Sequence, residues 1–163
     1  MPNQPIHTDT RVAAFLLSVL VTAAGPVNTQ LPKEAYRINP TKDPQAPFQV
    51  YVPEDLEDAF VELEKMLRPE LIADIKSRPE KDMIEHHFGL GIWMRNNWAL
   101  WKGSRLSEYF NKLGIDHPDD MAGIILDSFW RHLNNRPIDL DSQIARYKAY
   151  WENARKDQAK GKK

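Results

Sequence analysis

The 163-residue sequence contains no cysteine. Disulfide bonds, thiol catalysis and thiolate metal sites are therefore excluded, as is a lipoprotein anchor, which requires a cysteine after the signal segment. The sequence also lacks an excess of charge of either sign, because 22 basic and 23 acidic residues give a net charge of -1. This balance gives no electrostatic reason to expect nucleic-acid binding, and we predict no nucleic-acid partner.

Several short motifs of familiar chemistry are missing too. The sequence has neither a glycine-rich phosphate loop nor a Gly-x-Ser-x-Gly elbow around a nucleophilic serine. Glu85-His86-His87 suggests zinc, but a helical pair of metal ligands needs i, i+4 spacing, and Leu90 and Gly91 occupy the partner positions. We therefore predict no catalytic motif, no metal site and no cofactor.

The apolar run Val12–Ala24 is shorter than the roughly 20 residues that span a membrane. It follows Arg11 and ends in the small residues Thr22 and Ala24, which is typical of a secretory signal peptide cleaved after Ala24. The alternative is an uncleaved anchor, which would be the chain's membrane contact, or a buried apolar helix. We interpret residues 1–24 as a signal peptide and expect a periplasmic or secreted protein.

Proline is concentrated in residues 25–53, which contain six of the 12 prolines. Proline removes backbone donors and disfavours helix in the preceding residue, so we predict an extended linker. At its end, Val50 and Val52 alternate with Tyr51, which indicates a strand-like arm lying on the domain. At the other terminus, the lysine-rich residues 156–163 predict a basic disordered tail.

Residues 54–155 carry one recurring helix-start signal, a proline followed by acidic residues. Proline suits the first helical position, and acidic residues favour the positive end of the helix dipole. Apolar residues then recur at spacings of three and four, as on the buried face of a helix. The four start signals are Pro53-Glu54-Asp55, Pro69-Glu70, Pro79-Glu80 and Pro118-Asp119-Asp120. The prediction is an all-α fold, a compact bundle of about five or six short helices.

The central segment His87–Trp101 is apolar around its whole circumference, which predicts a buried helix. Gly89 and Gly91 would each weaken that helix by roughly 1 kcal/mol relative to alanine. We attribute them either to the close approach of another backbone or to a helix that begins after them.

Five specific motifs run through the same region. They stand at His87–Gly91, Arg95–Trp98, Gly103–Leu106, Tyr109–Phe110 and His117–Met121. Together they resemble an uncharacterised bacterial family, a domain of unknown function. The resemblance covers about two-thirds of the chain and implies a shared helical fold but no particular activity.

The polar run Arg95-Asn96-Asn97 interrupts the most apolar part of the chain. Consecutive helical residues fan over about 200°, so at least one of the three should point inward. One interpretation is a pocket in which the arginine and the amides hold a carboxylate, a phosphate or a peptide backbone. The other, which we favour, is an internal network in which Arg95 pairs with Asp119 or Asp120.

Two further motifs also have a structural and a functional interpretation. His117-Pro118-Asp119-Asp120 could act as a metal or acid/base cluster, but it is better explained as a helix start. Ser104 could be a nucleophile, but it is better explained as the N-cap of a helix over Arg105–Leu113. Five tryptophans should lie mostly in the core, with one or two at a binding surface. They are Trp93, Trp98, Trp101, Trp130 and Trp151.

The leading functional hypothesis is an exported, non-enzymatic module that binds another protein, as an immunity-type or accessory protein would. The alternative is a hydrolase-like enzyme with a polar pocket around Arg95, Asn96 and His117. The candidate binding residues are His87, Arg95, Asn96, Asn97, Trp98, Trp101, Ser104, Arg105, His117, Asp119 and Asp120.

Overall fold

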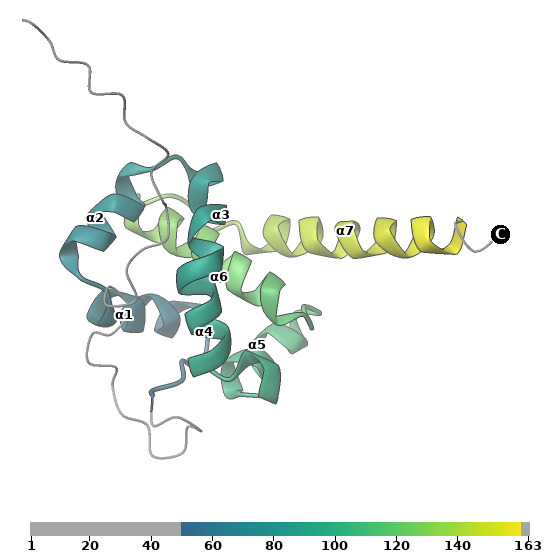
Figure 1. The fold of residues 1–163 in the computed structure, drawn as a ribbon, viewed down its shortest axis with the longest axis horizontal. Coiled ribbons are helices and arrows are strands. Elements are labelled where there is room, and N and C mark those ends of the chain that lie inside the picture. Colours follow the sequence, from purple (N-terminus) through teal and green to yellow (C-terminus); the bar gives the residue numbers. More distant parts are fainter. Residues whose placement is uncertain (1–49, 161–163) are drawn as a thin grey trace, which may run out of the picture.

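The computed structural model describes residues 50–160, and they form helices with no strand among them (Figure 1). The predicted all-α fold is confirmed. The α-helices are α1 (Leu56–Met66), α2 (Pro69–Ser77), α3 (Met83–His86), α4 (Ile92–Asn97), α5 (Arg105–Lys112), α6 (Pro118–Leu133) and α7 (Leu140–Lys160). The 3-10 turns η2 (Glu80–Asp82) and η4 (Leu100–Lys102) and the π-helical turn η3 (His87–Gly91) complete the order.

The centre of the fold is α6, which contacts every other α-helix. It buries eleven of its 16 residues, which is typical of a helix surrounded by others. The predicted apolar face of this helix, from Met121 to Phe129, lies in the main hydrophobic core. The rest of the core comes mainly from α1, α2, α4 and α5, and it encloses Leu63, Trp98 and Phe110.

The predicted start signals mark helix beginnings. Pro69 and Pro118 are the first residues of α2 and α6, and Pro79 directly precedes η2. Before α1, Asp55 is the N-cap and accepts a hydrogen bond from the Asp58 N–H at 2.9 Å. Ser104 is the predicted N-cap of α5 and accepts from the Ser107 N–H at 3.3 Å. These contacts satisfy donors that a helix N-terminus would otherwise leave unpaired.

The central segment differs from the prediction. The elements α3, η3 and α4 follow one another without a break, so the helix does not begin after the glycines. The crowding at Gly91 comes from side chains, since a Cβ there would lie 3.2 Å from Arg95 Nη1. Phe88 and Ile92 are exposed on this helix, so it is buried on one side only. A π-helical turn of this kind is frequent at functional sites.

The chain reverses after α4 at Ala99, a buried residue with φ of 53°. A non-glycine residue in this left-handed region costs of order 1 kcal/mol or more and persists only where the surroundings impose it. The reversal lets Trp98 face the core while Trp101, three residues later, is 54% exposed.

The last helix is longer than predicted. With 21 residues, α7 projects from the helical body (Figure 1). Residues 156–160, expected to be a disordered tail, are helical, and Lys156 pairs with Glu152 across one turn at 2.8 Å. Such i, i+4 pairs support exposed helices. Only Gln143 and Ile144 of this helix are buried.

The predicted linker also needs a correction at its end. Val50 and Val52 are buried in the core, because the chain there lies extended against the helices. Tyr51 between them donates a hydrogen bond to Asp58 at 2.7 Å. The arm belongs to the folded body, although it forms no strand within residues 50–160. The predicted signal peptide, residues 25–49 of the linker and residues 161–163 of the tail lie outside the described residues. No described helix is long and apolar enough to cross a membrane.

Candidate functional site

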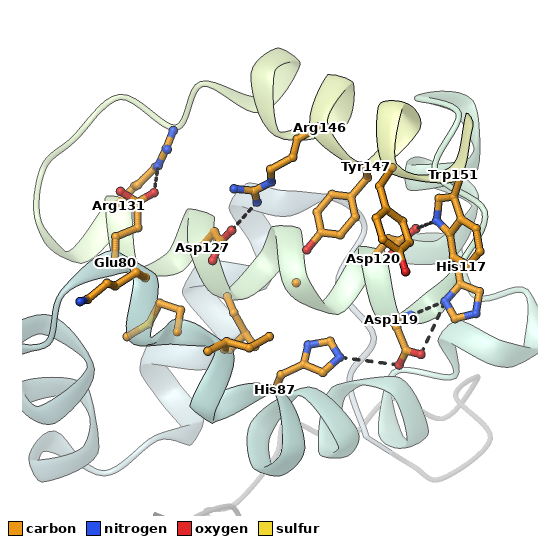
Figure 2. Close-up of a pocket in the computed structure, with 16 residues that line it drawn as sticks. Glu80, His87, His117, Asp119, Asp120, Asp127, Arg131, Arg146, Tyr147 and Trp151 are labelled. Atoms are coloured by element: carbon orange, nitrogen blue, oxygen red, sulfur yellow. Dashed lines mark hydrogen bonds and ion pairs between the residues drawn. The ribbon is translucent and has the colours of Figure 1, made fainter. Parts of the chain in front are cut away.

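A cleft of about 1000 Å³ opens between α3, α6 and α7 (Figure 2). Its floor is α6, which contributes Asp120, Gly123 and Asp127 at the spacing of a single helix face. One wall is α3 and the start of η3, with Ile84 and His87. The opposite wall is the middle of α7, whose cleft-lining residues are Arg146, Tyr147, Tyr150 and Trp151.

Gly123 allows α7 to lie close against the floor. A Cβ at this position would come within 2.1 Å of the Tyr147 hydroxyl oxygen, which is too close for any real contact. A larger residue at position 123 would therefore have to displace the Tyr147 ring that covers it, while the backbone there is not unusual. Burial raises the pKa of Tyr147, and the nearby Asp127 carboxylate raises it further.

Two ion pairs brace the cleft, Arg131–Glu80 at the end farthest from Trp151 and Arg146–Asp127 nearer its middle (Figure 2). Arg146 donates to Asp127 at 2.6 Å and joins α7 to α6. Arg131 donates to Glu80 at 2.5 Å and joins α6 to η2. Burial raises the pKa of Asp127, while Arg146 acts in the opposite direction.

The other end contains the ion pair that the sequence predicted. Arg95 Nε lies 2.9 Å from Asp119 Oδ1, so Arg95 takes part in an internal network. Its Nη1 atom lies 3.2 Å from His87 Nε2. Because a guanidinium only donates, His87 Nε2 accepts and the imidazole proton is on Nδ1. Burial lowers the pKa of His87, and Arg95 lowers it further, in agreement with a neutral ring.

His117 is the N-cap of α6, as predicted. Its Nδ1 accepts from the Asp119 N–H at 3.2 Å, which places the proton of the neutral ring on Nε2. Its ring lies between Trp101 and Trp151, with centroids 5.7 and 5.4 Å away. Both cleft histidines therefore use their lone pairs within the protein. A general base needs a lone pair directed at the substrate, so this geometry does not favour the hydrolase alternative.

Asp120 differs from the other carboxylates of the cleft. It is buried, and its Oδ2 accepts a hydrogen bond from Trp151 Nε1 at 2.5 Å (Figure 2). Burial raises the pKa of Asp120, while the Trp151 hydrogen bond opposes the increase. Glu80, Asp119 and Asp127 each pair with an arginine. Within residues 50–160, Asp120 forms no ion pair with lysine or arginine.

The mouth of the cleft carries exposed apolar side chains. Ile84 is 63% exposed on one wall, and Tyr150 is 63% and Trp151 40% exposed on the other. From Ile84 the exposed surface continues along the same helix at four-residue intervals to Phe88 and Ile92. Large exposed apolar patches with polar rims mark binding sites on soluble proteins.

The structure brings six of the eleven predicted site residues together: His87, Arg95, Trp101, His117, Asp119 and Asp120. The other five lie elsewhere. Asn96 is exposed outside the cleft lining, and Asn97 donates to the Trp93 carbonyl of its own helix at 2.9 Å. Trp98 is fully buried in the core, and Ser104 is a helix cap. Arg105 donates to the Val52 carbonyl and holds the arm.

Sequence reasoning missed the contribution of α7. Tyr147 and Trp151 are four residues apart on its apolar face, which suggests only core packing. The signal that could have found the site is the spacing of Asp120, Gly123 and Asp127, which places two acids and a glycine on one face of α6.

Comparison with known families agrees with the resemblance noted in the motifs. A family described as a domain of unknown function (DUF6794) matches residues 52–133, about half of the chain. The chain belongs to this family. The DUF6794 match covers α1 to α6, and therefore the floor and one wall of the cleft, while α7 lies beyond it. No curated protein and no solved structure matches the chain.

Proposed function

We propose that this member of the DUF6794 family is an exported, non-enzymatic module that binds another protein in the cleft between α3 and α7. The observation that carries the proposal is the gathering of exposed Ile84, Tyr150 and Trp151 at the mouth of that cleft. Tryptophan and tyrosine anchor protein interfaces because they bury a large area at a small cost in conformational entropy.

The polar contacts of the cleft support a binding role. The Arg146–Asp127 and Arg131–Glu80 pairs join separate elements, so they hold the walls in place before a partner arrives. A preformed site loses less conformational entropy on binding. The two histidines are likewise held in the protein's own hydrogen bonds, which suits a scaffold better than proton transfer.

Site-specific photo-crosslinking tests the binding role. With a photoreactive phenylalanine analogue in place of Tyr150, we expect one defined protein adduct in the native host, identified by mass spectrometry. The matched control is the same analogue at Val61, which is exposed and apolar but lies on α1 outside the cleft. Adding Ile84→Glu on the opposite wall should remove the Tyr150 adduct. Equal adducts at both positions, or none at Tyr150, would contradict the proposal.

Export is supported by the signal-like segment Val12–Ala24 and is tested separately. We expect the intact mass of the protein isolated from its native host to correspond to a chain beginning at Gly25. The fraction outside the cytoplasmic membrane should contain it. A chain that still starts at Met1 and remains in the cytoplasmic fraction would refute export without affecting the binding role.

A further inference from the structure

We infer that the Asp120 end of the cleft is a subsite for one basic side chain, lysine or arginine, of the partner protein. The inference rests on the proposed binding function and specifies the chemistry that the cleft recognises. It follows from a buried carboxylate that forms no ion pair with lysine or arginine within residues 50–160, in a cleft also lined by aromatic rings that suit a cation.

Asp120 supplies a buried carboxylate at this end of the cleft. Asp120 is 8% exposed, and among residues 50–160 the hydrogen bond to its side chain comes from the neutral Trp151 indole. A buried carboxylate normally has a cationic partner, because removing a charge from water is costly. Within residues 50–160, neither lysine nor arginine forms an ion pair with Asp120. His87 and His117 act against the rise in its pKa that burial causes, but they use their own ring nitrogens in other hydrogen bonds, and Asp119 is an acid paired with Arg95.

The surrounding rings suit an organic cation. Trp151 contacts His117 with centroids 5.4 Å apart, and Tyr150 packs edge-on at the same distance. Tyr147 lines the same cleft from one turn earlier on α7. A tryptophan face attracts ammonium and guanidinium groups, and an adjacent carboxylate adds a charge-assisted hydrogen bond. Aromatic rings around one acid are a chemical match for lysine or arginine.

The other charged side chains of the two cavities indicate from which side a basic side chain can reach Asp120. A smaller cavity of about 370 Å³ also reaches Asp120 and Trp151, but Lys148 and Arg155 line it and would repel a cation. In the main cleft, Arg131 and Arg146 are neutralised by their acidic partners, and the third cation, Lys81, is exposed to solvent beside Glu80. A basic side chain therefore reaches Asp120 from the main cleft, past exposed Tyr150.

The test is a nuclear magnetic resonance titration of the full ¹⁵N-labelled chain with Nα-acetyl-lysine methylamide. The reporter is the Trp151 indole N–H resonance, assigned with Trp151→Phe. We expect a saturable shift with the lysine compound and with its arginine analogue, and no shift with the uncharged norleucine analogue at equal concentration. Asp120→Asn retains an acceptor for Trp151 but removes the charge, so lysine binding should weaken at least ten-fold. The control Glu57→Gln removes one exposed charge from α1 and should bind as wild type does.

Two results would overturn the inference: an equal response to norleucine in the wild-type protein, or undiminished lysine binding in Asp120→Asn. The norleucine comparison needs no variant, so it holds even if Asp120→Asn folds poorly. Failure here is distinguishable from failure of the proposed function. A Tyr150 crosslink without lysine selectivity would refute the subsite alone, whereas lysine selectivity without any crosslink would refute the protein partner.

Discussion

Trp98→Ala is expected to lower the free energy of unfolding by about 3–5 kcal/mol, the usual cost of removing a large core aromatic side chain. Trp98 has no exposed surface and lies where α4 ends, with its ring 5.8 Å from that of Trp93. Its removal leaves a cavity in the core, which the neighbouring side chains fill only in part. The measurement is urea unfolding of the full chain.

Two controls separate core packing from the general effect of losing a tryptophan. Trp101→Ala removes the same side chain from a 54% exposed position and should cost less than about 1 kcal/mol. Trp98→Phe keeps most of the side-chain volume. It also loses no hydrogen bond, because the Trp98 indole N–H has no partner within residues 50–160. We therefore expect it to lower the free energy of unfolding less than Trp98→Ala does. An unchanged urea midpoint for Trp98→Ala would contradict its place in the core.

Asp119→Asn is expected to lower the free energy of unfolding by about 2–3 kcal/mol, because it leaves the Arg95 guanidinium buried without a counter-charge. Arg95 is 8% exposed, so water replaces the lost carboxylate only in part. His87 Nε2, its other partner, is neutral and compensates only weakly. The expected loss of unfolding free energy is smaller than for breaking a fully buried ion pair, because the Asp119 side chain is 42% exposed.

The opposite substitution provides the control. Arg95→Met leaves Asp119 as an exposed acid near the N-terminus of α6, where water and the helix dipole stabilise its charge. We expect it to cost only about 1 kcal/mol, the net value of a hydrogen bond to a charged group at a partly exposed site. Urea unfolding of both single variants and the double variant measures the coupling. If Arg95→Met proved the more damaging change, the assignment of Arg95 as the buried partner would be wrong.

Much of the fold could be predicted because its signals are local. Proline followed by acids located helix starts, and a four-residue spacing of apolar side chains identified the α1 and α6 core faces. The Ser104 and His117 caps depend only on residues two or three positions away. The partner of Arg95 was predictable only as far as Asp119 or Asp120, since a positive charge in an apolar helix requires an acid; the structure shows that it is Asp119.

The cleft was less predictable because it depends on how α7 crosses α6. The connection between them contains Asn135 and Asp139 with φ of 51° and 52°, left-handed positions that asparagine and aspartate tolerate but do not require. That connection sets the direction of α7. The direction decides whether Tyr147 and Trp151 enter the core or face a cleft.

The sequence by itself determined the helices, their caps, the absence of thiol chemistry and the need of Arg95 for an acid, because each follows from neighbouring residues or from composition. Only the tertiary structure decided that Trp151 reaches Asp120, that Tyr147 covers Gly123, and that Asn96 lies outside the site. Those outcomes depend on the packing of helices distant in sequence. Helix packing is fixed by the fit of whole surfaces, which no local pattern encodes.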